Sequence, residues 1–331
     1  MKRQLTLVAI IGPTASGKSA LAVDLAERLD GEVVACDSTQ VYRGFDIGTA
    51  KPTAAERRGI PHHLLDLVEP GEIFHAGEYR RRALAVLEDL AGRGRLPIFT
   101  VGTGLYLRAL IEGLCEAPPR SEDLRARLLR RTDERGPSYL HRMLERLDPA
   151  AAERIAPRDI PKMIRAIEVR LLAGTPISSL HRAGQTGLEG YRAIKIGLMP
   201  PRETLYARIA RRLEVMVDAG WIEEVRQLVA SGGAADAKPF DFIGYREWRE
   251  FLSGALTREQ ALERIQQSTR RYAKRQITWF RRETGVHWIE GFGDDADVAA
   301  KSLAIAQAAM AEGAEAGAGA GGSDARKRDT L

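Results

Sequence analysis

Apolar runs and amphipathic segments alternate through the first third of the chain. The continuous apolar run 5–11 ends at a glycine and predicts a strand that is buried on both faces, as in a parallel sheet. Shorter apolar runs at 32–36 and 96–101 predict two further strands, and residues 18–29 and 76–91 show the helical spacing of apolar positions. Strands that alternate with helices predict an α/β fold with a parallel sheet.

The pattern changes in the middle of the chain. Residues 118–181 are dense in Arg and Glu and contain no convincing strand, so we predict a helical insertion domain over 118–185. The first part of the α/β core then covers 1–117 and its continuation covers 186–292. The continuation begins with the strand-like run 194–199, after which the chain returns to the core.

The last third of the chain is mostly helical in pattern. Helices are predicted at 203–216, 222–230 and 258–284. Residues 293–331 drift into Ala and Gly repeats, a composition that cannot bury a core. We therefore predict a weakly structured tail, with disorder from about residue 311.

Composition narrows the class of protein. The 331 residues, 44% hydrophobic and 29% charged, are typical of a globular protein and exclude the fibrous and disulfide-scaffold classes. No stretch of 18 uncharged apolar residues occurs, which predicts a soluble protein with no membrane partner. Cys36 and Cys115 have no partners at metal-ligand spacing and suit a reducing compartment, so the cytoplasm is the expected location.

A glycine-rich motif lies between the first predicted strand and the first predicted helix. It fits the pattern G-x-x-x-x-G-K-[ST] of loops that cradle phosphates. Its residues are Gly12, Pro13, Thr14, Ala15, Ser16, Gly17, Lys18 and Ser19. Backbone N–H groups and the start of the following helix favour a diphosphate, which Lys18 would contact, while Ser19 would bind Mg²⁺.

The motif predicts a diphosphate-binding site without defining the reaction. Enzymes that transfer a phosphoryl group also need an acidic Mg²⁺ ligand at the end of a second apolar strand. The run 96–101 ends in Gly102 and Thr103, whereas an acid, Asp37, follows the run 32–36. A small-molecule or nucleotide kinase, with a lid at 120–146, therefore stays as an alternative, and an RNA-binding module without turnover is a third interpretation.

Charge is concentrated near the end of the last long helix. The net charge is only +5, but residues 270–282 hold six basic residues, no acidic ones and three aromatic residues. Such a segment predicts a nucleic-acid face. The alternative is a solvated basic face, with Trp279 and Phe280 packed into the core.

Six further motifs are spread along the chain. They are Asp37-Ser38-x-Gln40-Val41-Tyr42, D-I-G-T-A-K-P at 46–52, P-H-H-L-L-D at 61–66, G-T-G-L-Y at 102–106, G-Y-R at 244–246 and A-K-R-Q-x-T-W-F-R at 273–281. Together with the phosphate loop, they resemble the bacterial tRNA dimethylallyltransferases, the tRNA isopentenyltransferase family, over nearly the whole chain. One departure is Val101, where the family usually has a glycine; a positive φ there would strain a valine.

The resemblance implies a substrate, a metal and a partner. Dimethylallyl diphosphate, rather than ATP, would occupy the phosphate loop with Mg²⁺. The acceptor would be the exocyclic amine of the adenine 3′-adjacent to the anticodon of a tRNA, and diphosphate would be released. One tRNA for each chain suggests a monomer.

This chemistry assigns roles to a few residues. The amine must lose a proton, which the Asp37 carboxylate could accept, although an aspartate after a strand also suits a simple turn or helix cap. The departing diphosphate gathers charge, which cations stabilise. Arg208 and Arg212 lie four residues apart on one predicted helix face, and the resemblance favours Arg212, while a solvated basic face is the alternative. Thr14 would hydrogen-bond the diphosphate or the amine.

The target adenine is stacked in the anticodon arm, so it must be extruded into the protein. The strip from Asp37 to Gln40 is predicted to face it, and the remaining segments match those with which the family contacts tRNA. The residues predicted to contact tRNA are Asp37, Ser38, Thr39, Gln40, Thr103, Arg125, Pro161, Lys162, Met163, Ile164, Arg165, Phe242, Ile243, Gly244, Tyr245, Arg246, Glu247, Lys274, Arg275, Gln276, Thr278, Trp279, Phe280 and Arg281.

Overall fold

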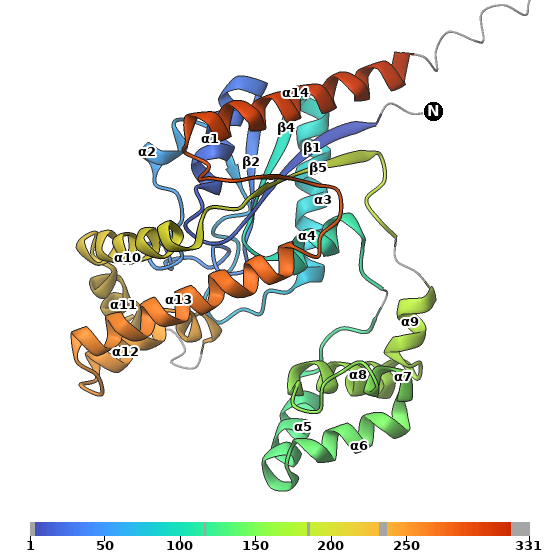
Figure 1. Cartoon of the computed structure of the whole chain (residues 1–331). Coiled ribbons are helices and arrows are strands. Elements are labelled where there is room, and N and C mark those ends of the chain that lie inside the picture. Colours follow the sequence, from blue (N-terminus) through green and yellow to red (C-terminus); the bar gives the residue numbers. More distant parts are fainter. Residues whose placement is uncertain (1–3, 116, 184–185, 232–236, 319–331) are drawn as a thin grey trace, which may run out of the picture. The chain divides into compact units, whose positions relative to one another are not determined.

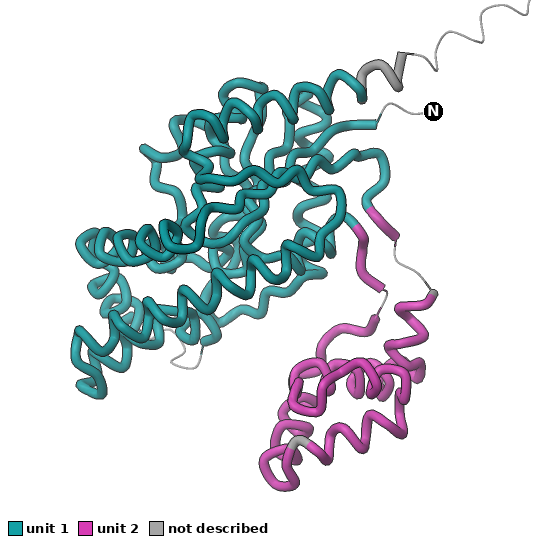
Figure 2. The backbone as a smooth tube through the Cα atoms, in the orientation of Figure 1, with its two compact units in different colours: residues 1–111, 188–331 teal, residues 112–187 magenta. Residues whose placement is uncertain are grey.

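The computed structural model describes residues 4–115, 117–183, 186–231 and 237–318. The chain divides into two compact units (Figure 2): unit 1 holds 1–111 and 188–331, and unit 2 holds 112–187. Unit 2 is thus inserted into unit 1, and the predicted insertion 118–185 lies inside its limits.

Unit 1 is built on a six-stranded parallel sheet with the strand order β3-β2-β4-β1-β5-β6. The strands are β1 (Leu5–Ile11), β2 (Gly31–Cys36), β3 (His62–His63), β4 (Leu96–Val101), β5 (Tyr191–Leu198) and β6 (Val286–Ile289). In the centre, Val8 of β1 lies opposite Ile98 of β4 and Ile194 of β5. This confirms the α/β fold and the four predicted strands; the short edge strands β3 and β6 carry too few apolar residues to be recognised from the sequence.

Both faces of the sheet are buried, as the apolar run of β1 predicted. Val8 and Ile10 pack into a core with α1 (Lys18–Leu29) and α14 (Ala296–Ala318). Leu7, Ala9 and Ile11 point to the opposite core, which includes α3 (Ala76–Arg93) and α4 (Gly104–Ile111). Alternate residues of one strand therefore hold helices on both faces.

The prediction of a weakly structured tail from residue 293 is wrong for the residues that the structure describes. Helix α14 begins at Ala296, continues past residue 311 to Ala318, and runs beside α1 (Figure 1). Its buried side chains recur at helical spacing, at Val298, Ser302, Ala306 and Ala309. Alanine is the best helix former, and its small side chain allows close packing. The prediction from composition did not take this helix propensity into account. Residues 319–331 lie outside the described residues.

The rest of unit 1 contains further helices, most of which add to the core on the α3 side of the sheet. Its elements are α2 (Ala54–Arg57), α10 (Arg202–Asp218), α11 (Trp221–Ala230), the 3₁₀ helix η1 (Lys238–Asp241), α12 (Tyr245–Leu252) and α13 (Arg258–Phe280). The helices predicted for this region match α10, α11 and α13 closely. No helix in the described part of the chain has the length and apolar character that a membrane span needs.

Unit 2 consists of helices in its described part, as predicted. They are α5 (Glu122–Arg135), α6 (Pro137–Leu147), α7 (Pro149–Ala152), α8 (Ile160–Ala173) and α9 (Ile177–Ala183). The unit has its own small core, to which Leu128, Leu140, Leu144 and Ile167 contribute. Asp148 caps α7 and also accepts hydrogen bonds from the backbone N–H and hydroxyl of Ser178, which ties α9 to the unit.

Candidate active site

The glycine-rich motif forms a loop between β1 and α1, at the edge of the sheet where the parallel strands end. Gly17 caps α1 with a φ of 87°, a left-handed conformation that favours glycine. The Lys18 side chain folds over the loop and donates to the carbonyls of Gly12 (3.0 Å) and Pro13 (2.8 Å). The predicted position of the motif, between a strand and the N-terminus of a helix, is confirmed, and binding of a diphosphate there stays a prediction.

The Lys18 ammonium lies in an unfavourable setting for its charge. Burial lowers its pKa from the usual 10.5 to about 8; the negative charge of Asp37 opposes this shift, and the positive charge of Arg212 adds to it. The loop thus holds a cation that needs a further anion nearby. A bound diphosphate would supply that anion.

Asp37 follows β2 and is fixed by its neighbours. Its Oδ1 accepts hydrogen bonds from the backbone N–H (2.8 Å) and the hydroxyl (2.6 Å) of Thr39. The backbone N–H of Ser38 donates to Thr103 Oγ1 (2.9 Å), and the Thr103 hydroxyl donates to Ser38 Oγ (3.1 Å). The expected turn role of Asp37 is therefore present, and Oδ2 takes no part in these bonds.

Gln276 joins the two loops that flank the site. Its Oε1 accepts from the Thr14 backbone N–H (2.7 Å), and its Nε2 donates to the Gly102 carbonyl (2.9 Å), which also accepts from the Tyr272 hydroxyl (3.3 Å). Gln276 is only 6% exposed. Gln276 thus lines the site beside the phosphate loop, and its predicted contact with tRNA stays a prediction.

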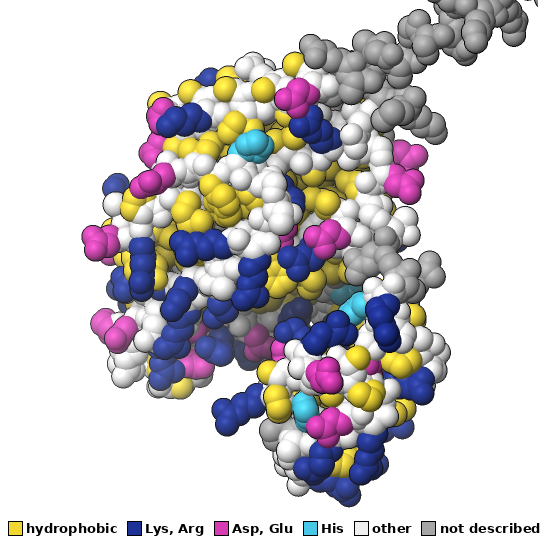
Figure 3. Space-filling view, turned by 45° about the vertical axis from the view of Figure 1, so that its right-hand side comes forward, with side chains coloured by type: hydrophobic (Ala, Val, Ile, Leu, Met, Phe, Trp, Pro, Cys, Tyr) yellow, Lys and Arg dark blue, Asp and Glu magenta, His cyan; other side chains and the backbone are white. Residues whose placement is uncertain are grey.

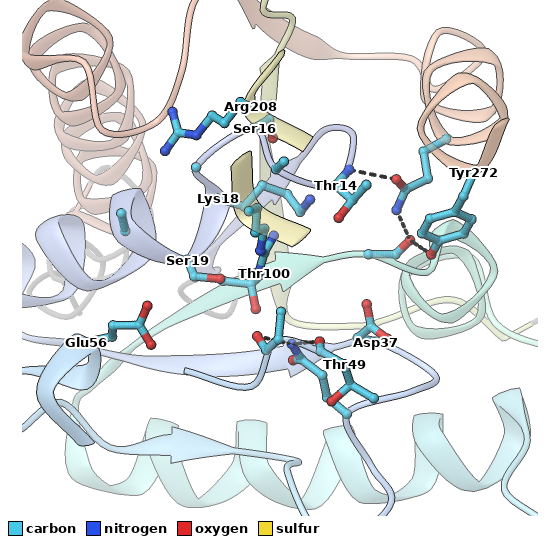
Figure 4. Close-up of a pocket in the computed structure, with 18 of the residues that line it drawn as sticks. Thr14, Ser16, Lys18, Ser19, Asp37, Thr49, Glu56, Thr100, Arg208 and Tyr272 are labelled. Carbon is cyan, nitrogen blue, oxygen red and sulfur yellow. Dashed lines mark hydrogen bonds between the residues drawn. The ribbon is translucent and has the colours of Figure 1, made fainter. Parts of the chain in front are cut away.

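Two cavities meet at this point, of about 390 Å³ and 350 Å³. They share the lining residues Thr14, Ala15, Asp37, Thr49, Ala50, Arg212 and Tyr272. In Figure 4, Thr14 and Asp37 lie on opposite sides of the space at this junction. Substrates in the two cavities would therefore meet beside Asp37 and Thr14.

The two cavities differ in chemistry. The first is lined by the phosphate loop and by Arg208, Arg211 and Arg212 of α10. The second is lined largely by apolar side chains, which are Ile209, Leu213, Met216, Trp221, Phe242 and Ile243. A charged group suits the first cavity, and an apolar group or a base suits the second.

The prediction that Arg208 and Arg212 share one face of a helix is confirmed for α10. Arg208 and Arg212 line the same cavity, as their spacing suggested. Burial lowers the pKa of Arg212, the charge of Glu56 opposes this shift, and that of Arg208 adds to it. Arg208 also donates to Asp294 Oδ2 (2.7 Å), an acid from the turn before α14. The sequence analysis missed Arg211, although it lies between the two chosen residues.

The loop at 46–51 forms one wall of both cavities through Thr49 and Ala50. The Glu224 carboxylate of α11 accepts from the backbone N–H groups of Asp46 (3.0 Å), Ile47 (2.7 Å) and Gly48 (3.3 Å). Gln40 Nε2 donates to the carbonyls of Thr49 (3.2 Å) and Ala50 (3.1 Å), so this amide positions the wall.

Glu224 was missed because no local pattern links residue 224 to residue 47, and only the fold brings them together. The Tyr245 hydroxyl donates to the same carboxylate (2.6 Å). Two predicted tRNA contacts next to it are corrected. Tyr245 is fully buried, and Glu247 is buried and accepts from the Gly244 N–H (2.7 Å), which begins α12. Gly244 is buried as well, whereas Arg246 is exposed.

Helix α13 presents the predicted basic face. Lys274, Arg275, Thr278 and Arg281 are exposed, and Trp279 is 37% exposed. Lys and Arg side chains gather on the face of the molecule drawn in Figure 3. Phe280 is 1% exposed and belongs to the core, so its prediction as a tRNA contact is corrected to the alternative that it packs inside.

In unit 2, the predicted contact residues separate into exposed and buried sets. Pro161 and Lys162, in the first turn of α8, are exposed. Met163 and Ile164 lie in the core of the unit, and their predictions are corrected, because both side chains belong to the face of α8 that packs inward.

Arg125 and Arg165 of unit 2 bind a buried carboxylate. Arg125 donates twice to Glu168 (2.8 and 2.9 Å), and Arg165 donates to the same carboxylate (2.6 Å). Glu168 is fully buried, so the two guanidinium groups neutralise it. Arg125 therefore joins α5 to α8, while Arg165 pairs with Glu168 within α8 and also donates to the Pro118 carbonyl (3.0 Å), roles that the sequence analysis did not foresee.

Comparisons with known proteins agree with this geometry. Residues 40–283 match the model of the IPP transferase family. A tRNA dimethylallyltransferase of Koribacter versatilis is 54% identical over 90% of this chain and 97% of its own length, and one of Solibacter usitatus is 50% identical over 89% and 95%.

Solved structures agree as well. A tRNA isopentenylpyrophosphate transferase from Bacillus halodurans has a TM-score of 0.70 and 39% identity, covering 94% of this chain and 98% of that one. A eukaryotic dimethylallyltransferase acting on tRNA has a TM-score of 0.81 and 26% identity, covering 93% and 80%. On these matches, which span most of its length, the chain belongs to the IPP transferase family.

Proposed function

We propose that the chain transfers a dimethylallyl group from dimethylallyl diphosphate to the exocyclic amine of the adenine 3′-adjacent to the anticodon of tRNA, releasing diphosphate. The observation that supports this most is the junction of two cavities, one lined by cations and one by apolar side chains, beside Asp37. A diphosphate ester with an apolar tail and an aromatic base as acceptor fit such a pair. The names of the curated relatives point to the same reaction.

The cationic cavity suits the leaving group. In the reaction, the bond between the allylic carbon and a diphosphate oxygen breaks, and negative charge builds up on the diphosphate. Lys18, Arg212 and the N-terminus of α1 all lie beside the phosphate loop, where they would stabilise that charge. Because these groups are in place before the substrate binds, little reorganisation is needed during the reaction.

Asp37 suits the acceptor side. As the carbon–nitrogen bond forms, the amine becomes cationic and must release a proton, which the carboxylate would accept. The bonds from Thr39 hold Oδ1, so the orientation of the carboxylate is fixed. Thr14, on the same junction, would hydrogen-bond the amine or the diphosphate.

The first cavity also fits Mg²⁺ held mainly by the diphosphate. Ser19, in the first turn of α1, is exposed and lines this cavity with Thr100 and the carboxylate of Glu56. Among the described residues, no three His, Cys, Asp or Glu side chains gather into a metal site. That donor set suits Mg²⁺, which keeps several waters and is usually bound through few protein ligands plus phosphate. When bound, the ion would neutralise charge on the diphosphate.

A tRNA partner is supported by the exposed side chains of α13, among them Lys274, Arg275 and Arg281. The walls of the second cavity, including Phe242 and Trp221, suit a base that has been extruded from its stack. We expect one monomer in the cytoplasm to act on one tRNA.

The kinase alternative receives less support. Strand β4 ends at Val101 and is followed by Gly102 and Thr103, without a carboxylate for a nucleotide-bound Mg²⁺. A kinase would also use ATP as the donor. The two hypotheses therefore predict different substrates for the phosphate loop.

A transfer assay separates these functions. The protein is incubated with unmodified tRNA, Mg²⁺ and either radiolabelled dimethylallyl diphosphate or radiolabelled ATP. We expect label from the prenyl donor in the tRNA, and none with a Lys18→Ala variant as the matched control. Phosphoryl transfer from ATP would support the kinase, and tRNA binding without incorporation would support the RNA-binding module.

A further inference from the structure

The turn 291–295, which precedes α14, lies against the phosphate loop. The Gly293 backbone N–H donates to the carbonyl of Ser16 (2.8 Å). A Cβ atom on Gly17 would lie 2.7 Å from both Gly293 N and Asp294 Oδ1. The contact is thus too close for any side chain at residue 17, and the turn supports the loop from the side of Gly17.

The same turn holds Arg208 through two different contacts. Arg208 Nη2 donates to Asp294 Oδ2 (2.7 Å), and the guanidinium lies over the ring of Phe292 at 4.6 Å from its centre. While held in this way, Arg208 still lines the cavity that contains the phosphate loop. The turn therefore fixes an arginine that faces the site.

This arrangement favours an Arg208 that Asp294 orients for a phosphate over an Arg208 that Asp294 withholds from it. A guanidinium has five N–H donors, and the bond to Asp294 uses one of them, so others remain for a phosphate. An arginine side chain has many rotamers, and restricting them before binding reduces the entropy that binding must remove. Phe292 adds a contact that does not depend on the carboxylate.

We propose that Asp294 is a positioning residue that orients Arg208 toward the diphosphate. The inference rests on the proposed function, because it takes the first cavity to be the diphosphate site. Asp294 itself does not line that cavity and acts through Arg208. Removing its charge should therefore weaken binding of diphosphate only while Arg208 is present.

A double-mutant cycle tests this coupling. Binding of inorganic diphosphate with Mg²⁺ is measured by calorimetry for the full-length wild type, Asp294→Asn, Arg208→Ala and the double variant. We expect Arg208→Ala to raise the Kd about tenfold or more and Asp294→Asn to raise it about three- to tenfold. In the Arg208→Ala background, Asp294→Asn should change nothing further.

A matched control separates local positioning from general charge. Asp297, in the first turn of α14, carries the same charge and pairs with Lys301. Asp297→Asn should leave the Kd unchanged. Should Asp294→Asn fail to fold in a thermal scan, Phe292→Leu removes the other contact with Arg208 without changing charge, and the same coupling is expected.

Three results would overturn the inference. The first is tighter binding of diphosphate by Asp294→Asn, which would mean that the carboxylate competes with the diphosphate for Arg208. The second is an equal effect of Asp294→Asn on the Kd with and without Arg208. The third is no effect of Asp294→Asn on the Kd. Wild-type turnover with dimethylallyl diphosphate and tRNA is measured in parallel. A wild type that binds diphosphate but transfers no prenyl group would contradict the proposed function while leaving the coupling measurable.

Discussion

The Asp37 carboxylate lies directly against the backbone of Gly102. A Cβ atom on Gly102 would lie 2.0 Å from Asp37 Oδ2, closer than any real contact allows. A glycine is needed at residue 102 for space and not for its backbone freedom, because the φ of Gly102 is not left-handed. Val101 is a buried residue of β4 without a positive φ, so the condition under which a valine would be strained there is not met. Gly102, the glycine that leaves space for the Asp37 side chain, is therefore present in this chain even though residue 101 is a valine.

We predict that Gly102→Ala impairs the chemical step. The new methyl group would push the Asp37 carboxylate out of place, so the single-turnover rate should fall at least about tenfold, and a displacement of about 1 Å can cost 10²-fold. Gly92→Ala is the matched control, because Gly92 lies in α3 with open space around it. That control should leave turnover unchanged and stabilise the protein by about 0.5–1 kcal/mol.

Replacing Asp37 separates its turn role from its proposed role as a base. Asp37→Asn keeps an oxygen that can accept from the backbone N–H of Thr39, whereas Asp37→Ala removes it. If Asp37 accepts the proton, both variants should lower the single-turnover rate about 10²–10⁴-fold with pre-bound tRNA, while tRNA affinity stays near the wild-type value. A normal rate for Asp37→Asn would leave Asp37 with the turn role alone.

Binding of dimethylallyl diphosphate should depend on pH through Lys18. The pKa of Lys18 in the free protein is lowered to about 8, so the ammonium is charged below pH 8 and becomes neutral above it. A bound diphosphate favours the charged form and raises this pKa, and the two states then differ in bound protons. Affinity should be level below pH 8 and fall above it, by up to about tenfold for each pH unit.

Calorimetric titration of the prenyl diphosphate between pH 7 and 9.5 measures this dependence. Lys18→Ala is the control: it should bind more weakly at every pH and lose the decline above pH 8. A level affinity in the wild type across the whole range would show that the charge on Lys18 does not govern binding.

Local patterns predicted the parts of the site that are continuous in sequence. The phosphate loop follows from its glycines and from the elements on either side, and Asp37 follows from its place after a buried strand. The bonds between distant residues could not be predicted in this way. Gln276 lies 262 residues from Thr14, and its place within a basic segment suggested a surface role. The fold brings it against the phosphate loop instead.

Helices explain most of the corrected tRNA contacts. Met163, Tyr245 and Phe280 lie in segments that resemble contact segments, and each is buried although an adjacent residue, Lys162, Arg246 or Arg281, is exposed. A resemblance over successive residues selects a segment, and helical periodicity then decides which side chains reach the surface. The same reasoning keeps Lys274, Arg275 and Arg281 as candidate contacts.

Arg281 provides the test of the basic face, because it lies at the C-terminal end of α13 and is exposed. A cation that contacts a phosphate releases counterions on binding, so Arg281→Ala should weaken all tRNA substrates alike. It should also reduce the slope of log K against log salt by about 0.7–0.9. Arg28→Ala is the matched control, since Arg28 is exposed at the C-terminal end of α1, away from the phosphate loop that begins this helix. Titrations with anticodon stem-loops at several salt concentrations measure both variants. An unchanged slope for Arg281→Ala would assign Arg281 to a solvated face, and an equal change for Arg28→Ala would mean that overall charge, rather than contact, sets the affinity.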